Sequence, residues 1–169
     1  MSPAPCPPPA RPDAIPGPAR ARTRTPAAQR PRTAQLEMRA VRAAPGRARA
    51  FLRAALADWG LTALTDDAEA ITSELVTNGI TASQQAAPAG IPPAPVWLTI
   101  TDATAELFID VWDPSPEPPA AGHVPGTWDE NGRGLLIVKA LSHRWAWCHI
   151  NGHGGKVVWA AIRTSPLAS

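Results

Sequence analysis

The sequence predicts an α/β fold, a two-layer sandwich in which a mixed or antiparallel sheet carries its helices on one face. Three observations lead to this prediction. Apolar residues recur at three- and four-residue steps over 66–83, as in an amphipathic helix. Two runs rich in alternating apolar residues, 96–101 and 106–112, follow as strands joined by a hairpin-sized loop. Each of these elements has one apolar side, and packing helices on a sheet buries both sides.

Charge divides the chain into two unlike parts. Residues 1–49 hold ten arginines against two acids, a net of +8, whereas the rest holds six basic side chains against twelve acids, a net of −6, which together give +2. Residues 1–33 are rich in proline and arginine and poor in apolar side chains, so we expect a disordered leader there. One domain over 34–164 and a short tail over 165–169 complete the chain. Because the domain is acidic, we expect no direct nucleic-acid binding.

The first two elements of the domain are expected to be an edge strand and a helix. Polar and apolar residues alternate over 34–40, which favours a strand. A broad apolar side over 47–59 favours a helix, and Gly60 is placed to end it.

The central helix, over 66–83, is expected to begin with a capping box. Asp66 can accept hydrogen bonds from the first amides of the helix, and Glu69 can reach back toward it. Glu74 and Asn78 lie four residues apart and therefore project side by side. Their oxygens suit a hard cation such as Mg²⁺, although such a pair also occurs as two solvated side chains.

Asp113 closes the second hairpin strand, and a Pro-rich loop runs from there to about residue 131. Loops of this length in a compact domain are usually functional or disordered. Gly132-Arg133-Gly134 then leads into the last three elements, a helix and two strands over 135–141, 144–150 and 156–162. The element order is therefore strand–helix–helix–strand–strand–loop–helix–strand–strand.

Two kinds of side chain in the strands are given structural roles. Four of the seven tryptophans are expected to pack the sheet against the helices, namely Trp97, Trp112, Trp147 and Trp159. Lys156, at the start of the last strand, is expected at the edge of the sheet, with a contact to a phosphate as the alternative.

Cysteine use and hydropathy indicate the compartment. Cys6 lies in the leader and Cys148 in a strand, so we expect no structural disulfide and a reducing environment. No run of about eighteen apolar residues is available to span a bilayer. Prolines interrupt the leader, which therefore lacks the apolar core of a secretory signal. We expect a cytoplasmic protein with no membrane partner.

Residues in four places would each have a task if the ligand were a nucleotide. A carboxylate at the end of a buried strand, Asp113, needs a strong donor, and the adenine amino group is one. The glycines of 132–134 let free helix amides approach a phosphate. Asn78 would hold Mg²⁺, and Glu74 would orient or deprotonate an attacking hydroxyl. Asp113 could equally start a turn, and the glycines could form a plain loop.

Taken together, these segments resemble the sequence boxes of the GHKL ATPase superfamily, which includes gyrase, MutL and histidine kinases. The resemblance covers about residues 36–163 and is carried by four segments, 74–78, 111–113, 132–135 and 155–159. Within the superfamily the chain is most similar to the anti-sigma-factor serine/threonine kinase branch, in particular to short ATP-binding regulatory proteins of actinomycetes. The resemblance implies a Bergerat ATP-binding fold, with ATP and Mg²⁺ as cofactors.

The resemblance also implies roles for single residues. Glu74 would be the catalytic carboxylate, Asn78 the Mg²⁺ ligand and Asp113 the residue that reads adenine. The loop over 114–131 would be the ATP lid. The nucleotide-binding residues implied in this way are Asn78, Asp113, Ser115, Gly132, Arg133, Gly134 and Leu135.

Two functions are compatible with the resemblance. The first is a protein kinase that transfers phosphate to a STAS-type anti-anti-sigma partner and controls a sigma factor. The alternative is a non-catalytic module that senses ATP or ADP and binds a protein. The chain departs from the family pattern at Ser115, where glycine is usual, and at Gly79, where alanine is frequent, so phosphoryl transfer stays open, as does a homodimer. A histidine kinase fragment fits less well, because all four histidines follow residue 122 and no acceptor helix precedes the domain.

Overall fold

The computed structural model describes residues 31–103, 105–119, 133–150 and 154–164 of the chain. Five strands form one sheet in the order β1-β2-β3-β5-β4, and every neighbouring pair is antiparallel. The strands are β1 (Arg32–Met38), β2 (Val96–Asp102), β3 (Glu106–Asp113), β4 (Arg144–His149) and β5 (Lys156–Arg163). The helices are α1 (Ala44–Trp59), the 3₁₀ turn η1 (Thr62–Leu64), α2 (Thr65–Ala86) and α3 (Arg133–Leu141).

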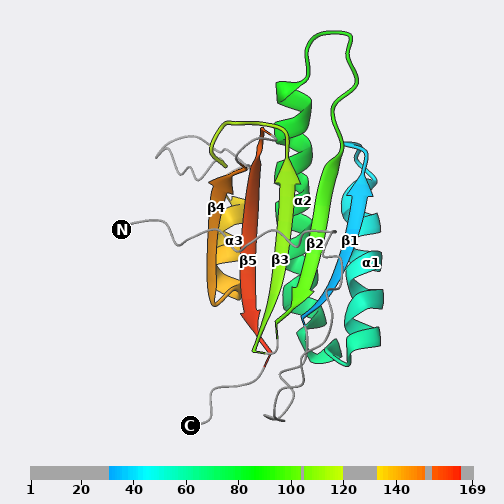
Figure 1. Ribbon diagram of the computed structural model, residues 1–169, viewed down its shortest axis with the longest axis vertical. Coiled ribbons are helices and arrows are strands. Elements are labelled where there is room, and N and C mark those ends of the chain that lie inside the picture. Colours follow the sequence, from blue (N-terminus) through cyan, green and yellow to red (C-terminus); the bar gives the residue numbers. More distant parts are fainter. Residues whose placement is uncertain (1–30, 104, 120–132, 151–153, 165–169) are drawn as a thin grey trace, which may run out of the picture.

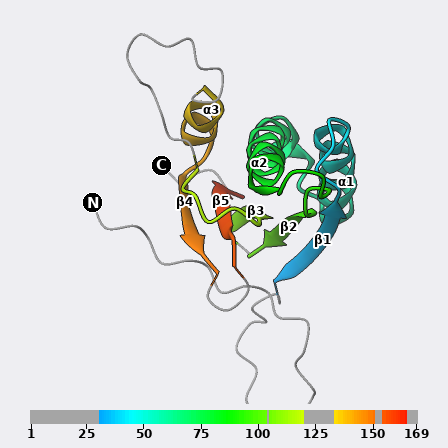
Figure 2. The same ribbon diagram turned by 90° about the horizontal axis from the view of Figure 1, so that it is seen from above.

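All three α-helices lie on one face of the sheet, as Figure 2 shows from above and Figure 1 shows from the uncovered side. The predicted two-layer α/β sandwich is therefore confirmed, with an antiparallel sheet. The core lies between the layers, where α2 meets the middle strands, and its fully buried side chains include Leu75, Leu98, Ile100 and Ile109.

The central helix begins differently from the prediction. Its N-cap is Leu64, which makes no side-chain cap hydrogen bond and is already close to helical, with φ −94° and ψ −1°. The reason is that η1 leads directly into α2, so Asp66 lies inside the first turn instead of before it. The predicted capping box is wrong, although an acidic side chain in the first turn still favours the helix dipole.

Strand alternation decides which tryptophans reach the core. In β3, Leu107, Ile109, Val111 and Asp113 are buried, and the residues between them point to the face that the helices leave uncovered. Trp147 packs against the core as predicted. Trp97, Trp112 and Trp159 lie on the uncovered face, because the helix-facing positions of their strands are taken by aliphatic residues such as Leu98, Val111 and Val158. For these three tryptophans the prediction is wrong.

Two further findings concern the compartment. Cys148 on β4 is disulfide-bonded, contrary to the prediction of no structural disulfide, and the other cysteine of the chain, Cys6, lies outside the described residues. Within the described part of the chain, no helix is both long and apolar enough to cross a bilayer.

Asp110, on the uncovered face of β3, gives a first prediction. Burial raises its pKa to about 7, so between pH 5 and 7 the folded protein retains a proton that the unfolded chain has lost. The free energy of unfolding should therefore fall by about 3 kcal/mol from pH 5 to pH 8 through this group alone. Asp110→Asn removes this titrating group. Urea unfolding should therefore show that the variant has a higher free energy of unfolding than the wild type at pH 8, and that this difference is smaller at pH 5. A gain that does not depend on pH would contradict this assignment.

Candidate functional site

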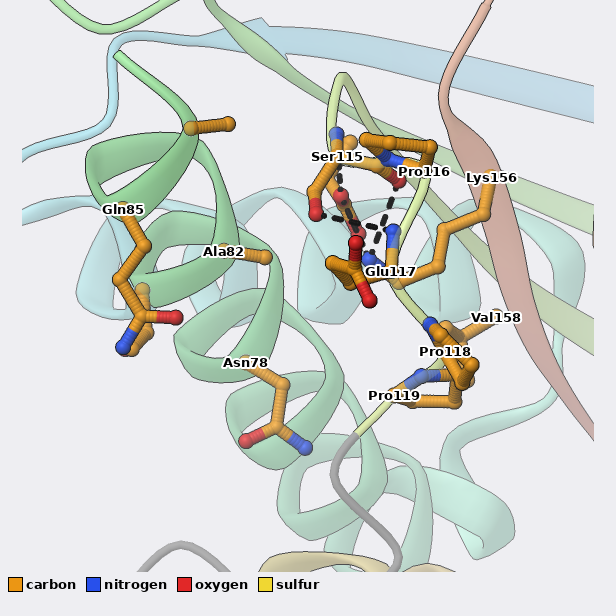
Figure 3. Close-up of a pocket in the computed structure, with 13 residues that line it drawn as sticks. Asn78, Ala82, Gln85, Ser115, Pro116, Glu117, Pro118, Pro119, Lys156 and Val158 are labelled. Carbon is orange, nitrogen blue, oxygen red and sulfur yellow. Dashed lines mark hydrogen bonds and ion pairs between the residues drawn. The ribbon is translucent and has the colours of Figure 1, made fainter. Parts of the chain in front are cut away.

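A cavity of about 410 Å³ opens between α2, the loop that follows β3, and the start of β5. Figure 3 shows α2 side chains forming one wall and the loop from Ser115 to Pro119 facing them. Its lining residues from α2 are Asn78, Thr81, Ala82, Gln85 and Ala86. The other lining residues are Asp113, Ser115, Pro116, Glu117, Pro118, Pro119, Lys156 and Val158. The described part of the cavity is thus made by one helix, the loop that follows β3, and residues of the neighbouring strands β3 and β5.

Asp113 and Lys156, which both line this cavity, form a buried ion pair. They lie opposite each other in the β3–β5 ladder, Lys156 Nζ is 2.9 Å from Asp113 Oδ1, and the two residues are only 1% and 2% exposed. Burial raises the pKa of Asp113, and the hydrogen bonds and charge of Lys156 together with the Ser115 N–H oppose that rise. The prediction that Lys156 lies at the sheet edge is wrong, because β5 lies between β3 and β4.

The loop after β3 is held by successive side-chain turns. The Ser115 N–H donates to Asp113 Oδ1 at 2.9 Å, and the Glu117 N–H donates to Ser115 Oγ at 3.2 Å. Such short side-chain to backbone bonds mimic a turn and fix the direction of the chain. The His149 ring contacts the Pro116 carbonyl through Nε2 at 2.8 Å. The Asp113 carboxylate is therefore held by the backbone of Ser115, the residue that stands where the family pattern has a glycine.

Two glycines allow the backbone to come close to Asp113. Gly155 has φ +74°, and a Cβ there would collide with the Asp113 carbonyl oxygen. Gly79, in the middle of α2, lies against the sheet, where a Cβ would be 3.1 Å from Val111 Cγ1 and 3.2 Å from Val96 Cγ1. The departure from alanine at Gly79 therefore has a packing reason, which is the close approach of α2 to the end of β3.

The structure brings Glu74 and Asn78 against the start of α3. A Cβ on Gly134 would collide with Glu74 Oε2 and would lie 3.7 Å from Asn78 Nδ2. The start of α3 therefore lies directly against both side chains, and a larger residue at 134 would require the Glu74 carboxylate to move aside. Asn78 lines the cavity, whereas Glu74, one turn earlier, does not belong to its described lining.

The remaining predicted site residues are distributed as follows. Leu135 is 4% exposed and packs in the core. Arg133 begins α3, and Gly132 lies outside the described residues, as does the 120–131 part of the predicted lid.

Sequence reasoning missed two residues of the site. It placed Glu117 in the lid loop without giving it a role, and it missed Thr81 and Gln85 in the cavity wall and the pairing of Lys156 with Asp113. In the sequence, the pair appears only as an acid that ends one strand and a base that begins another. The two residues are seen to lie opposite each other only once the strands are known to be antiparallel neighbours.

A family model for the histidine kinase-like ATPase domain matches residues 38–162, which is most of the chain. The chain belongs to the histidine kinase-like ATPase family. The predicted superfamily is thereby confirmed, and ATP binding is the function that this ATPase domain implies. No curated protein matches the chain. The branch within the superfamily stays a prediction.

The described residues of this ATPase domain fit a bound nucleotide. The cavity volume lies within the range of about 300–1,000 Å³ that small-molecule sites have. Lys156 and the Ser115 N–H both bond to Asp113 Oδ1, so among contacts within the described residues Oδ2 stays an acceptor available to a donor such as the adenine amino group. The Asn78 carboxamide makes no hydrogen bond to any described residue and can supply an oxygen to Mg²⁺.

Proposed function

We propose that this protein is an Mg-ATP-dependent serine/threonine kinase that phosphorylates a STAS-type anti-anti-sigma protein and so controls a sigma factor. The observation that carries the proposal is the meeting of Glu74 and Asn78 with Gly134 beside a cavity whose other end is Asp113. It supports a nucleotide that spans from Asp113 to the start of α3.

In this proposal each residue of the chain has a distinct task. Asp113 would accept a hydrogen bond from the base, and Asn78 would be a ligand of Mg²⁺, which would neutralise charge on the phosphates. The bound nucleotide supplies the phosphoryl group that is transferred. Glu74 would accept the proton of the serine or threonine hydroxyl while the hydroxyl oxygen attacks the γ-phosphorus of ATP and ADP leaves with the bridging oxygen. A carboxylate in this role contributes about 10²–10⁴-fold to the rate. The start of α3 contributes backbone N–H groups, which favour anions.

A second candidate is a module that binds ATP or ADP and a protein partner without phosphoryl transfer. Two observations favour it. Glu74 lies against Gly134 and outside the described cavity lining. The loop segment facing α2 contains Pro116, Pro118 and Pro119, and fixed φ angles restrict its movement.

The test is transfer of label from γ-labelled ATP to a STAS-domain anti-anti-sigma protein. Glu74→Gln should reduce transfer at least 100-fold while nucleotide binding, measured by calorimetry, stays within about threefold of wild type. Glu69→Gln is the matched control, because Glu69 lies on the same helix but pairs with Arg53 at the surface. Asn78→Ala should weaken Mg-ATP binding and leave weak binding in EDTA unchanged.

The outcomes separate the two candidates. Label transfer that Glu74→Gln abolishes and Glu69→Gln preserves supports the kinase. ATP binding without transfer to any partner supports the sensing module. Absence of ATP binding by the wild type would reject both.

The proposed function places the protein in the cytoplasm, where ATP and sigma factors are found. Stable disulfides are rare in that compartment, so the bond at Cys148 makes its redox state informative. Alkylation of thiols in freshly lysed cells would measure the fraction of Cys148 that is oxidised.

A further inference from the structure

The uncovered face of the sheet carries a straight row of side chains that crosses four strand boundaries. Direct pairing partners in the ladders define it, from β4 to β1: Cys148, Val157, Trp112, Trp97 and Glu37. Trp145 and Trp147 pack toward the core, so Cys148 points to this uncovered face, which Figure 1 shows in front of the helices. Trp97 is 40% exposed. We call these five residues the aromatic row.

The strand positions beside the aromatic row are more buried than a bare sheet face would be. Trp159 is only 1% exposed although no helix covers it. The described side chains stacked on its ring are Phe108 and Arg144. Among the described residues, neither Trp159 Nε1 nor Asp110 Oδ1 has a hydrogen-bond partner. Buried polar atoms of this kind are uncommon and call for a cover with donors and acceptors of its own.

One segment of the chain is connected to this face by covalent chemistry. Cys148 is disulfide-bonded, and Cys6 is the only other cysteine in the sequence. Cys6 lies in the segment Pro3-Ala4-Pro5-Cys6-Pro7-Pro8-Pro9-Ala10-Arg11-Pro12. Such a composition favours the polyproline II conformation, and aromatic-lined surfaces are the usual docking sites for polyproline II segments.

We propose that residues 3–12 dock across the aromatic row as a polyproline II segment, tethered by a disulfide between Cys6 and Cys148. The occupant of this sheet face is therefore the leader of the same chain. The proposal is independent of the phosphoryl-transfer chemistry.

The spacing of the segment matches the spacing of the row. Neighbouring strands lie about 4.8 Å apart, so Trp112 is about 10 Å and Trp97 about 14 Å from Cys148 along the row. Polyproline II rises about 3.1 Å per residue, so Pro9 and Arg11 lie about 9 Å and 15 Å beyond Cys6. Pro9 then faces the ring of Trp112 and Arg11 reaches the ring of Trp97.

Charge and chain length agree with a segment that runs from Cys148 toward β1. Arg11 arrives next to Glu37, the ladder partner of Trp97, and an arginine over a tryptophan ring gains a cation–π contact. The chain from Arg11 to the start of β1 can span about 60 Å when extended, which is ample for the return to Arg32.

The tether is a balanced redox step. Two thiols lose two protons and two electrons as the S–S bond forms. A small-molecule disulfide such as oxidised glutathione accepts both and leaves as two molecules of thiol.

The first test is peptide mapping of the full-length oxidised protein without reduction. It should show a cross-linked pair of peptides, one with Cys6 and one with Cys148. A free Cys6, or a Cys148–Cys148 link between two chains, would overturn the proposal, and the latter would assign the face to a second copy.

The second test separates docking from tethering. In protein labelled with 5-fluorotryptophan, the ¹⁹F resonances of Trp97 and Trp112 are assigned with Trp97→Phe and Trp112→Phe. The triple variant Pro7→Ser, Pro8→Ser, Pro9→Ser keeps the disulfide and should shift both resonances toward those of Cys6→Ser. The matched control Pro16→Ser, Pro18→Ser lies outside the docked segment and should shift neither. Unchanged resonances in the triple variant would mean a tether without docking and would overturn the proposal.

Discussion

Replacing Asp113 with alanine is expected to destabilise the protein by about 3–5 kcal/mol and to abolish nucleotide binding. The stability loss follows because the change leaves the Lys156 ammonium, 2% exposed, without its carboxylate, and an unpaired buried charge costs that much. The binding loss follows from the proposed role of Asp113 as the acceptor for the adenine amino group, because the variant cannot make that hydrogen bond to a charged group. Urea unfolding and titration calorimetry with Mg-ATP measure the two effects.

The double variant Asp113→Ala, Lys156→Met separates the effect on stability from the effect on nucleotide binding. Removing both charges should recover most of the stability, because a buried ion pair replaced by apolar side chains is often neutral. Nucleotide binding should stay lost, because the acceptor is still missing. A double variant that binds Mg-ATP as tightly as wild type would show that Asp113 has only a structural role.

Gly155→Ala is expected to have the second-largest effect, a loss of at least about 3 kcal/mol. A left-handed backbone costs an alanine about 1–2 kcal/mol, and here the added Cβ would also collide with the Asp113 carbonyl oxygen and lie 3.0 Å from Pro114 Cα. Neither atom belongs to a flexible side chain, so the β4–β5 loop or the end of β3 must move. Because that end carries Asp113, nucleotide affinity should fall together with stability.

Gly154→Ala is the matched control. Gly154 has φ +69°, but a Cβ there would meet nothing within 4 Å. Gly154→Ala should therefore lose only the stability that a left-handed backbone costs an alanine, and its Mg-ATP affinity should stay within about twofold of wild type. Equal unfolding free energies for the two variants would contradict the close contact between Gly155 and β3.

The order of elements was predictable because each has a strong local signal. The alternation in β2 and β3 and the long apolar stripe of α2 place these elements within a few residues of their observed bounds. The start of α2 was not predictable, because the preceding turn η1 already gives Leu64 a nearly helical backbone and no capping side chain is needed. Local patterns therefore predicted the type of element better than its first residue.

The candidate site was predictable only in part. Asn78 and Asp113 carry recognisable patterns, and both line the cavity. The pairing of Asp113 with Lys156 depends on which strands are neighbours and on their register, which no local pattern contains. The prediction of which sheet face the tryptophans occupy failed for the same reason. Alternation divides the residues of each strand into two sets, and the size of the side chains does not say which set packs against the helices.

The tight contact at Gly79 limits the order in which this region can change during evolution. A methyl group there would press on one γ-methyl of Val96 and one of Val111, so both valines would have to give way by a few tenths of an ångström. Lineages that acquire Gly79→Ala are therefore expected to change positions 96 and 111 as well. The three positions form a coupled set, and a sequence that breaks the coupling would show a helix displaced from the strand that carries Asp113.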